Sequence, residues 1–253
     1  MLQVPPERIR TTRTVIPFLD TDDPFPPPEL ALQHPNGLLA AGGDLSPARL
    51  LDAYAQGIFP WFGREDPLLW WSPDPRMVLY VGELKISRSL RRTIRSGRFR
   101  VAIDTAFADV ISGCAEPRPG QDGTWITPEM HDAYCRLFEM GYAHSVETWS
   151  GNRLVGGLYG VSLGRMFFGE SMFTRESDAS KVGFVHMVAQ LGRWNMPLID
   201  CQMPTSHLAS LGAREIPRAD FLDQITQLVQ ELAPPAPWRL DEDLSQRLGT
   251  MSL

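Results

Sequence analysis

The sequence lacks long apolar runs, paired cysteines and histidine clusters, and each absence excludes a class of protein. No apolar stretch approaches the roughly 18–20 residues that a membrane-spanning helix needs. The first residues, MLQVPPERIR, lack the apolar centre of a signal peptide, so we expect a cytoplasmic protein. The three cysteines are odd in number and far apart, which excludes a disulfide framework. The five histidines show no HxH or HExxH spacing, so we expect no metal site.

Acidic residues are missing from one conspicuous segment of an otherwise acidic chain. The 253 residues carry a net charge of −6, and 43% of them are apolar, as in globular proteins of one large or two modest domains. Residues 85–100 read KISRSLRRTIRSGRFR, with seven basic residues and no acid, so the rest carries −13. This segment indicates a local phosphate-binding site. A solvated helix face is the alternative, and composition does not decide between them.

The N-terminal part predicts a small domain with little regular structure. The first 30 residues are rich in proline and threonine, which indicates an irregular, exposed arm. Ser46, Pro47 and Gly57 are good cap and first-turn residues, so they predict a helix over 47–56. The stretch GIFPWFGREDPLLWWSPDPR that follows contains four prolines, which exclude long regular elements. We therefore expect a domain boundary near residue 76, with domains 1–76 and 77–253.

The remainder predicts an α/β domain. We expect strands over 77–81, 99–103, 143–149, 153–162, 165–173 and 197–201, and helices over 88–96, 105–114, 128–140, 179–194, 205–211 and, as the last element, 218–232. The motif Ser150-Gly151-Asn152 is a good hairpin signal. An antiparallel sheet that runs into a βα unit is typical of an acyltransferase-like layout. The glycines of 156–164 lie within a strand, so we expect them to permit close backbone approach rather than phosphate binding.

Three polar residues interrupt apolar strands and are candidates for chemistry. Glu170 lies within MFFGESMF, where a carboxylate is either paired or placed to meet a cation. Asp200 and Gln202 end the strand LIDCQ on one face, with Cys201 on the other. They could form a site at the strand end or only cap the next helix, and both interpretations stay open. We expect Cys201 to be buried and inert.

These motifs resemble one known family. GLLAAGGDLSPARLLDAYAQGIFPWF, WWSPDPR, GTWIT, GYAHSVETW, GESMF and LIDCQ…HLASLGAREIPR are similar to the bacterial leucyl/phenylalanyl-tRNA–protein transferases, in order and at matching spacings, from about residue 25 to 221. The chain departs from the family mainly in its N-terminal arm, in EPRPGQDG at 116–123 and in its C-terminal tail. The resemblance implies a GNAT-like domain after a small N-terminal domain. It also implies transfer of Leu, Phe or, less efficiently, Met from aminoacyl-tRNA to proteins with N-terminal Arg or Lys, without a cofactor, to create an N-degron.

The resemblance also implies roles for individual residues. Contacts to tRNA phosphates are expected from Lys85, Arg88, Arg91, Arg92 and Arg95. Stacking of the terminal adenosine is expected from Tyr54, Trp61 and Trp125, whereas Trp70 and Trp71 are expected in the core. The apolar pocket for the esterified side chain would consist of Leu158, Phe167, Met172, Phe184, Met187 and Ile199.

The reaction that the resemblance implies is aminolysis of an activated ester. Glu170 would hold or orient the cationic acceptor, Gln202 would contact the attacking amine, and Asp200 would orient Gln202 and relay the proton. A neutral amide is a poor base, so removal of the proton by the tRNA 2′-hydroxyl or by water stays open.

Two rival functions are weighed against the transferase. An acyl-CoA-dependent N-acetyltransferase would need a glycine-containing pyrophosphate loop, and the segment RESDASK before the helix at 179 contains no glycine. An RNA-binding module would explain the basic segment but neither Glu170 nor the LIDCQ strand. We expect a monomer.

Overall fold

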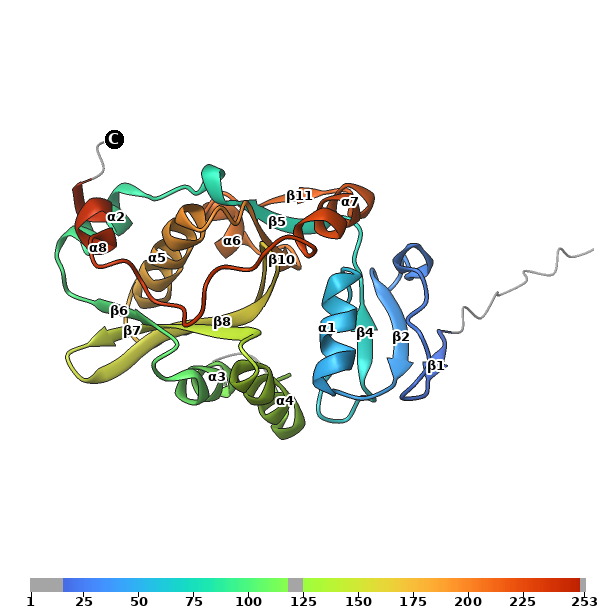
Figure 1. The fold of residues 1–253 in the computed structure, drawn as a ribbon. Coiled ribbons are helices and arrows are strands. Elements are labelled where there is room, and N and C mark those ends of the chain that lie inside the picture. The colour runs from blue at the N-terminus through green and yellow to red at the C-terminus, as the bar shows by residue number, and fades with distance from the viewer. Residues whose placement is uncertain (1–15, 118–124, 251–253) are drawn as a thin grey trace, which may run out of the picture.

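The computed structural model describes residues 16–117 and 125–250, and within them the chain forms two β-sheets with helices packed on them. Figure 1 shows the smaller sheet with helix α1 (Pro47–Ala55) beside the larger sheet. The chain passes from one sheet to the other between Trp71 and Arg76. Helix α1 begins as predicted, because the Ser46 hydroxyl accepts a hydrogen bond from the Arg49 backbone N–H.

The small sheet has the order β1-β2-β4-β3. Its strands are β1 (Phe18–Leu19), β2 (Leu38–Gly42), β3 (Phe59–Pro60) and β4 (Leu69–Trp71), and a short 3-10 helix, η1, spans Pro28–Leu30. The expectation of an irregular, exposed arm is therefore wrong for part of it, because Leu19 and Phe25 are buried; residues 1–15 lie outside the described residues. Strand β2 was not predicted, because its Ala and Gly residues carry little strand propensity.

The large sheet has the order β11-β5-β10-β9-β8-β7-β6. Its strands are β5 (Arg76–Tyr80), β6 (Arg100–Ile103), β7 (Ala143–Ser150), β8 (Arg153–Leu163), β9 (Met166–Thr174), β10 (Leu198–Gln202) and β11 (Arg214–Ile216). The other helices are η2 (Val81–Glu83), α2 (Arg88–Arg95), α3 (Phe107–Ala115), α4 (Pro128–Glu139), α5 (Ala179–Arg193), α6 (Ser206–Ser210), α7 (Arg218–Leu228) and α8 (Leu244–Thr250). Helices α3 and α4 lie on one face of the sheet and α5 on the other (Figure 1). The α/β class is confirmed.

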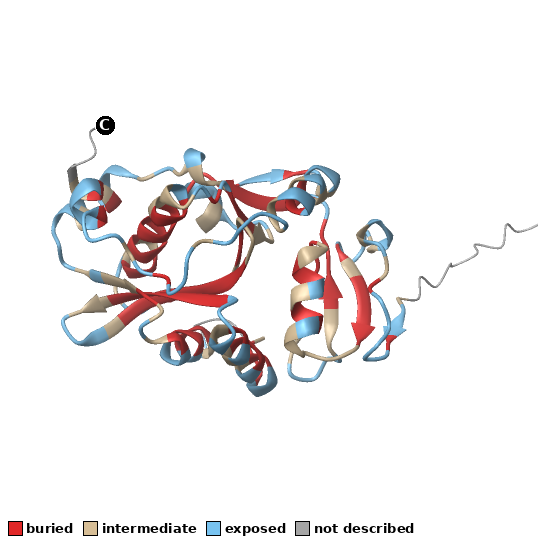
Figure 2. Cartoon of the chain, viewed as in Figure 1, coloured by how far each residue is buried: buried red, intermediate tan, exposed pale blue. Residues whose placement is uncertain are grey.

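Two apolar clusters fill the two faces of the large sheet, and Figure 2 shows the central strands and α5 almost entirely buried. The cluster on the α3–α4 side continues into the small sheet, since it includes Leu39, Tyr54 and Trp70 together with Phe107 and Phe168. Trp70 and Trp71 belong to this core, as predicted. The two sheets therefore share one continuous apolar interior.

The hairpin between β7 and β8 has the predicted turn, and Gly151 adopts φ +59° there. The expectation of close backbone approach is confirmed at Gly160, because a Cβ atom there would lie 2.2 Å from the Phe168 carbonyl oxygen. The last predicted helix ends earlier than expected, at Leu228, and it is not the last element. Helix α8 follows and packs on α2.

Strands β9 and β10 pair in parallel only from Leu198↔Met166 to Asp200↔Phe168. Beyond this point β10 has a register shift between Asp200 and Gln202, and β9 has one that leaves Glu170 unpaired against β8. Such bulges redirect side chains and end pairing. The strands separate where the three polar candidates lie, and this opening positions the site.

Candidate active site

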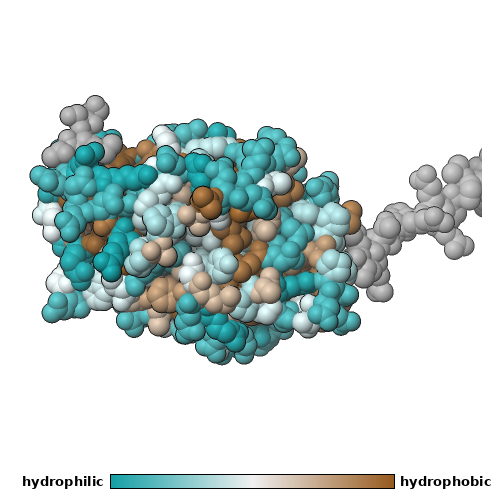
Figure 3. All heavy atoms as spheres, in the orientation of Figure 1, coloured by the Kyte–Doolittle hydropathy of each residue, from teal (hydrophilic) through white to brown (hydrophobic). Residues whose placement is uncertain are grey.

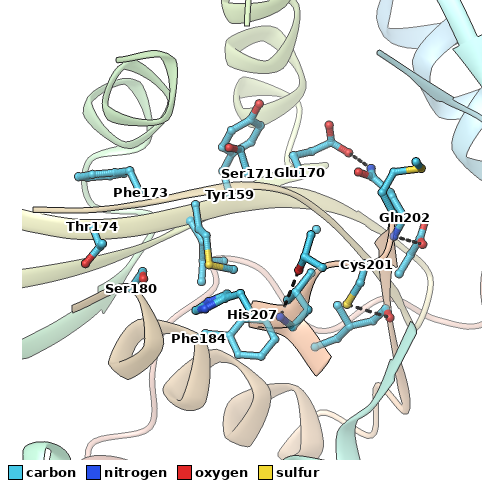
Figure 4. A pocket seen from close by; sticks show the side chains of 18 of the residues that line it. Tyr159, Glu170, Ser171, Phe173, Thr174, Ser180, Phe184, Cys201, Gln202 and His207 are labelled. Carbon is cyan, nitrogen blue, oxygen red and sulfur yellow. Dashed lines mark hydrogen bonds between the residues drawn. The ribbon is translucent and has the colours of Figure 1, made fainter. Parts of the chain in front are cut away.

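A cavity of about 690 Å³ opens where β9 and β10 separate. Its lining includes Glu170 and Gln202, and these two side chains point toward one another from neighbouring strands (Figure 4). On the face of the molecule in Figure 3, apolar atoms gather in the middle and hydrophilic atoms surround them. A largely apolar cavity with a few converging polar groups is typical of a ligand site.

The Glu170 carboxylate accepts three hydrogen bonds from neutral donors. Oε1 lies 2.7 Å from the Tyr54 hydroxyl oxygen and 2.8 Å from Gln202 Nε2. Oε2 lies 2.8 Å from the Tyr134 hydroxyl oxygen. Burial raises the pKa of Glu170 to about 7, although the three hydrogen bonds act in the opposite direction. Its partners in the described structure are neutral donors, so Glu170 is not paired with a cation there, and its placement at the cavity leaves it able to meet a cationic acceptor.

Asp200 is fully buried and paired with Arg76. Arg76 Nε and Nη2 lie 2.8 and 2.6 Å from the two carboxylate oxygens, a bidentate geometry. The guanidinium lies between the rings of Phe59 and Phe221, at 4.8 and 4.7 Å from their centroids. Asp200 Oδ1 also accepts a hydrogen bond of 2.8 Å from the Gln202 backbone N–H. Asp200 thus fixes the backbone of Gln202, which has φ +60°.

The sequence left open whether Asp200 and Gln202 only cap a helix. The cap of α6 is Thr205, whose hydroxyl accepts from the Leu208 N–H, so the capping interpretation is wrong. Gln202 reaches Glu170 on the α4 side while Cys201 packs against the cluster on the α5 side, so these two face opposite ways as predicted, although a register shift interrupts the strand between Asp200 and Gln202.

Six apolar residues line the cavity on the α5 side of the sheet. They are Leu158, Phe167, Met172, Phe184, Met187 and Ile199, the set predicted for the side-chain pocket. All six belong to the same apolar cluster. The structure therefore brings together residues from β8, β9, α5 and β10 into one wall.

Comparison with known proteins gives matches over most of the chain. Residues 78–226 match the family model described as leucyl/phenylalanyl-tRNA protein transferase, and residues 43–74 match the model of its N-terminal domain. The chain is 58% identical over 229 residues to a leucyl/phenylalanyl-tRNA--protein transferase of Nitrosospira multiformis, covering 90% of this chain and 99% of that protein. The chain belongs to the leucyl/phenylalanyl-tRNA–protein transferase family.

Solved structures are similar at a much lower level. One, of L-PGS from Bacillus licheniformis, has a TM-score of 0.39 and 9% identity and covers 67% of this chain and 54% of that one. Another, a GCN5-related N-acetyltransferase from Kribbella flavida, has a TM-score of 0.32 and 10% identity and covers 67% and 60%. Nothing about the function follows from likenesses at this level.

The residues carried over from the transferase family for adenosine stacking do not share one environment. Trp61 and Trp125 line the cavity, and Trp61 is 41% exposed. Tyr54 has no exposed surface, and its ring packs 5.1 Å from that of Phe168. The stacking role predicted for Tyr54 is therefore wrong in this structure, because a base cannot reach a fully buried ring.

Cys201 is partly buried and lines the cavity. Burial raises the pKa of its thiol well above the usual range, with the Asp200 carboxylate adding to the effect. A thiol of this kind is a poor nucleophile, because the reactive form is the thiolate. The expectation of an inert Cys201 agrees with this environment, although the side chain is less buried than expected.

The basic segment forms helix α2 and its flanks, with Ser87 as the predicted cap. Lys85, Arg88, Arg92 and Arg95 are exposed, and Arg91 is half-buried. Arg95 donates to the Gly249 carbonyl of α8. Figure 1 places α2 at the end of the large sheet that lies away from the small sheet. Four of the five predicted residues are thus exposed on or beside α2, and none of the five lines the cavity.

Two residues of the site were missed by sequence analysis. Arg76 is the first residue of the otherwise apolar strand β5. A cation in such a strand indicates a buried partner of opposite charge, and this signal could have found it. Tyr134 follows the apolar spacing of α4 and looks like an ordinary core residue.

The described residues contain no group of three or more His, Cys, Asp or Glu side chains that could hold a metal, and none of their helices is long and apolar enough to span a membrane.

Proposed function

We propose that this protein transfers Leu, Phe and, less efficiently, Met from aminoacyl-tRNA to the α-amino group of an N-terminal Arg or Lys. The observation that carries the proposal is the cavity, in which an apolar wall ends at the polar groups Glu170 and Gln202. Family membership supplies the reaction class. The wall would receive the amino-acid side chain, and the polar end would receive the acceptor amine.

The amino-acid preference follows from the chemistry of the wall. Phe167, Phe184, Met172 and Met187 are large or flexible, and methionine adapts to side chains of different shape. Leu, Phe and Met fit such a wall, whereas β-branched Ile and Val are stiff at χ1 and fit less well. Selection would therefore rest on the amino acid rather than on the tRNA.

The tRNA would lie along α2 and reach the cavity with its 3′ end. Lys85, Arg88, Arg91, Arg92 and Arg95 would make sequence-independent phosphate contacts. Trp61 and Trp125 at the cavity would stack on the terminal adenosine, each worth about 1–3 kcal/mol.

Catalysis would consist mainly of alignment, since the ester is already activated. Holding the amine against the carbonyl can supply roughly 7–11 kcal/mol. Gln202 would contact the amine, Asp200 would keep Gln202 in place through its backbone, and Glu170 would face the cationic acceptor. The product would carry an N-degron that marks it for proteolysis in the cytoplasm. We propose that the protein acts as a monomer.

The test is transfer of labelled amino acid to matched peptides beginning with Arg, Lys or Ala, without ATP or CoA. We expect label on the Arg and Lys peptides only. The donors are Leu and Ile esterified to the same tRNA, so that only the side chain differs. We expect Ile to react at least about tenfold more slowly. Transfer that requires CoA, or equal transfer to the Ala peptide, would contradict the proposal.

A further inference from the structure

Glu170 is held by helices from both sides of the boundary between the two sheets. Tyr54 comes from α1, which packs with the small sheet, and Tyr134 comes from α4, which packs on the large one. Both tyrosine side chains are fully buried, and both hydroxyls contact the carboxylate. The bulge in β9 leaves Glu170 without a strand partner and directs it toward them. The carboxylate also faces the cavity, next to Gln202.

The Glu170 carboxylate and the hydroxyls of Tyr54 and Tyr134 form a closed ring of hydrogen-bonding contacts. This ring has room for one proton in addition to the two hydroxyl hydrogens. The Tyr54 and Tyr134 hydroxyl oxygens are 2.5 Å apart, and each lies within 2.8 Å of a Glu170 oxygen. Three oxygen–oxygen contacts need three hydrogens, and the two hydroxyls bring two. When Glu170 is ionised, both tyrosines donate to it and their own contact lacks a hydrogen. When Glu170 is protonated, its O–H donates to one tyrosine and the ring is complete.

We propose that Glu170, held in this ring by Tyr54 and Tyr134, is the base that accepts the proton of the attacking α-amine. The inference rests on the proposed transferase function and deepens it, because it assigns the proton route. Glu170 is then a catalytic residue, and the two tyrosines are positioning residues that set its affinity for the proton.

The atoms of the step balance without a further reactant. The α-ammonium group of the acceptor gives one proton to the Glu170 carboxylate and becomes a neutral amine. Its nitrogen forms a bond to the ester carbonyl carbon, and the bond between that carbon and the ribose 3′-oxygen breaks. The second proton of the nitrogen goes to the 3′-oxygen, which leaves as a hydroxyl. Glu170 then releases its proton to water.

The other carboxylate of the site is poorly suited to this role. Asp200 is fully buried, and its two oxygens are occupied by Arg76 and by the Gln202 N–H. The Gln202 amide is a poor base. Glu170 has the reach, because its Oε1 lies 2.8 Å from Gln202 Nε2 at the cavity wall.

The electrostatic environment agrees with this geometry. Burial raises the pKa of Glu170 to about 7, where a base is most effective at neutral pH. The tyrosine hydrogen bonds lower the pKa, so loss of either hydroxyl should raise it further. The charge that acts on Glu170 is the Asp200 carboxylate, which raises its pKa and is itself paired with Arg76.

The experiment measures the single-turnover transfer rate at saturating peptide between pH 5.5 and 9. The variants are Tyr54→Phe, Tyr134→Phe and Glu170→Gln. The control is Tyr80→Phe, which loses a hydroxyl hydrogen bond to Gln224 outside the cavity. The same peptide is used with every variant, so the titration of the peptide's own α-amine contributes equally to all pH profiles. The pKa of Glu170 is also followed directly by NMR of ¹³Cδ-labelled glutamate, with Glu170→Gln to assign the signal.

We expect the rate of the wild type to rise with pH through about 7, because the base must be ionised. In Tyr54→Phe and Tyr134→Phe this rise should move to higher pH by about half a unit or more, together with the NMR titration. Glu170→Gln should lose about 100-fold or more in rate. Tyr80→Phe should match the wild type.

The outcomes separate the two proposals. A wild type that transfers no label at any pH overturns the transferase function and the proton route with it. If the wild type is active but both tyrosine variants follow its pH profile and NMR titration, the function stands and the assignment of the base is wrong. Near-normal transfer by Glu170→Gln has the same consequence.

Discussion

The Arg76–Asp200 pair determines where Gln202 points. Both side chains are fully buried, and the carboxylate divides its hydrogen bonds between the guanidinium and the backbone of Gln202. Burying two charges is expensive, and a buried pair is stable only when its remaining hydrogen bonds are satisfied. Here the pair holds a residue in the left-handed conformation, which a non-glycine residue adopts only under constraint.

Replacing Arg76 with Met should lower the free energy of unfolding by about 3–5 kcal/mol, because Asp200 would stay buried without its partner. The double variant Arg76→Met/Asp200→Asn should recover part of this loss, since the unpaired charge is gone. Urea unfolding measures both effects.

Arg214→Met is the matched control for this pair. Arg214 pairs with Glu83 at an exposed position, with 51% of its side chain exposed, so its loss should change stability by about 0–1 kcal/mol. If Arg76→Met and Arg214→Met lowered the free energy of unfolding equally, the buried pair would contribute no more to stability than the exposed one.

Helix α2 has a buried inner face and a positively charged outer face. Leu90 is buried beneath the helix, while Arg88 and Arg92 are exposed. The segment has no acidic residue to neutralise them internally. In its C-terminal flank, Arg98 forms an ion pair with Glu176. This cationic surface suits the phosphate contacts that we propose for α2.

The double variant Arg88→Ala/Arg92→Ala should weaken tRNA binding and reduce the slope of log affinity against log salt by roughly 1–2. The measurement is tRNA affinity at several salt concentrations. As a control, Arg136→Ala/Arg214→Ala removes two exposed cations outside the basic segment. An unchanged slope in Arg88→Ala/Arg92→Ala would remove α2 from the tRNA-binding surface.

Most elements of the large sheet could be predicted from the sequence, because hydrophobic periodicity and caps identify them. Strand β2 and helix α8 could not, since one is rich in small residues and the other follows a proline-rich stretch. The site was predicted through polar residues that interrupt apolar strands, such as Glu170. Tyr134 was missed and Tyr54 was given another role, because a buried tyrosine that hydrogen-bonds a carboxylate has the same sequence pattern as an ordinary core tyrosine.

The two sheets are joined through their interior rather than through a linker alone. One apolar cluster runs from Trp70 in the small sheet to Phe107 and Phe168 beside the large one. The C-terminal segment packs on the large sheet, where Trp238 stacks on His144 of β7 at 3.6 Å between ring centroids. Interfaces that bury large apolar side chains couple the stability of both parts.

The protein should therefore unfold in one cooperative transition, although two family models match it. Far-UV circular dichroism and tryptophan fluorescence in urea should give coincident curves, because Trp61, Trp70 and Trp71 report on the small sheet and Trp149 and Trp238 on the large one. Two separate transitions would show that the shared core contributes little.

Tyr54 lies in α1, before the point where the chain crosses from the small sheet to the large one, and Glu170 lies in β9, after that point. The acidity of Glu170 is therefore a property of the assembled protein and belongs to neither part alone. A protease cut between Trp71 and Arg76 would leave Glu170 and the six apolar cavity residues on the larger fragment, and Tyr54 and Trp61 on the smaller one. Once the fragments part, the larger one would lack a hydrogen bond that lowers the pKa of Glu170 and one side of its cavity. Activity at neutral pH would then report whether the two pieces are still together, and mixing them again would restore it.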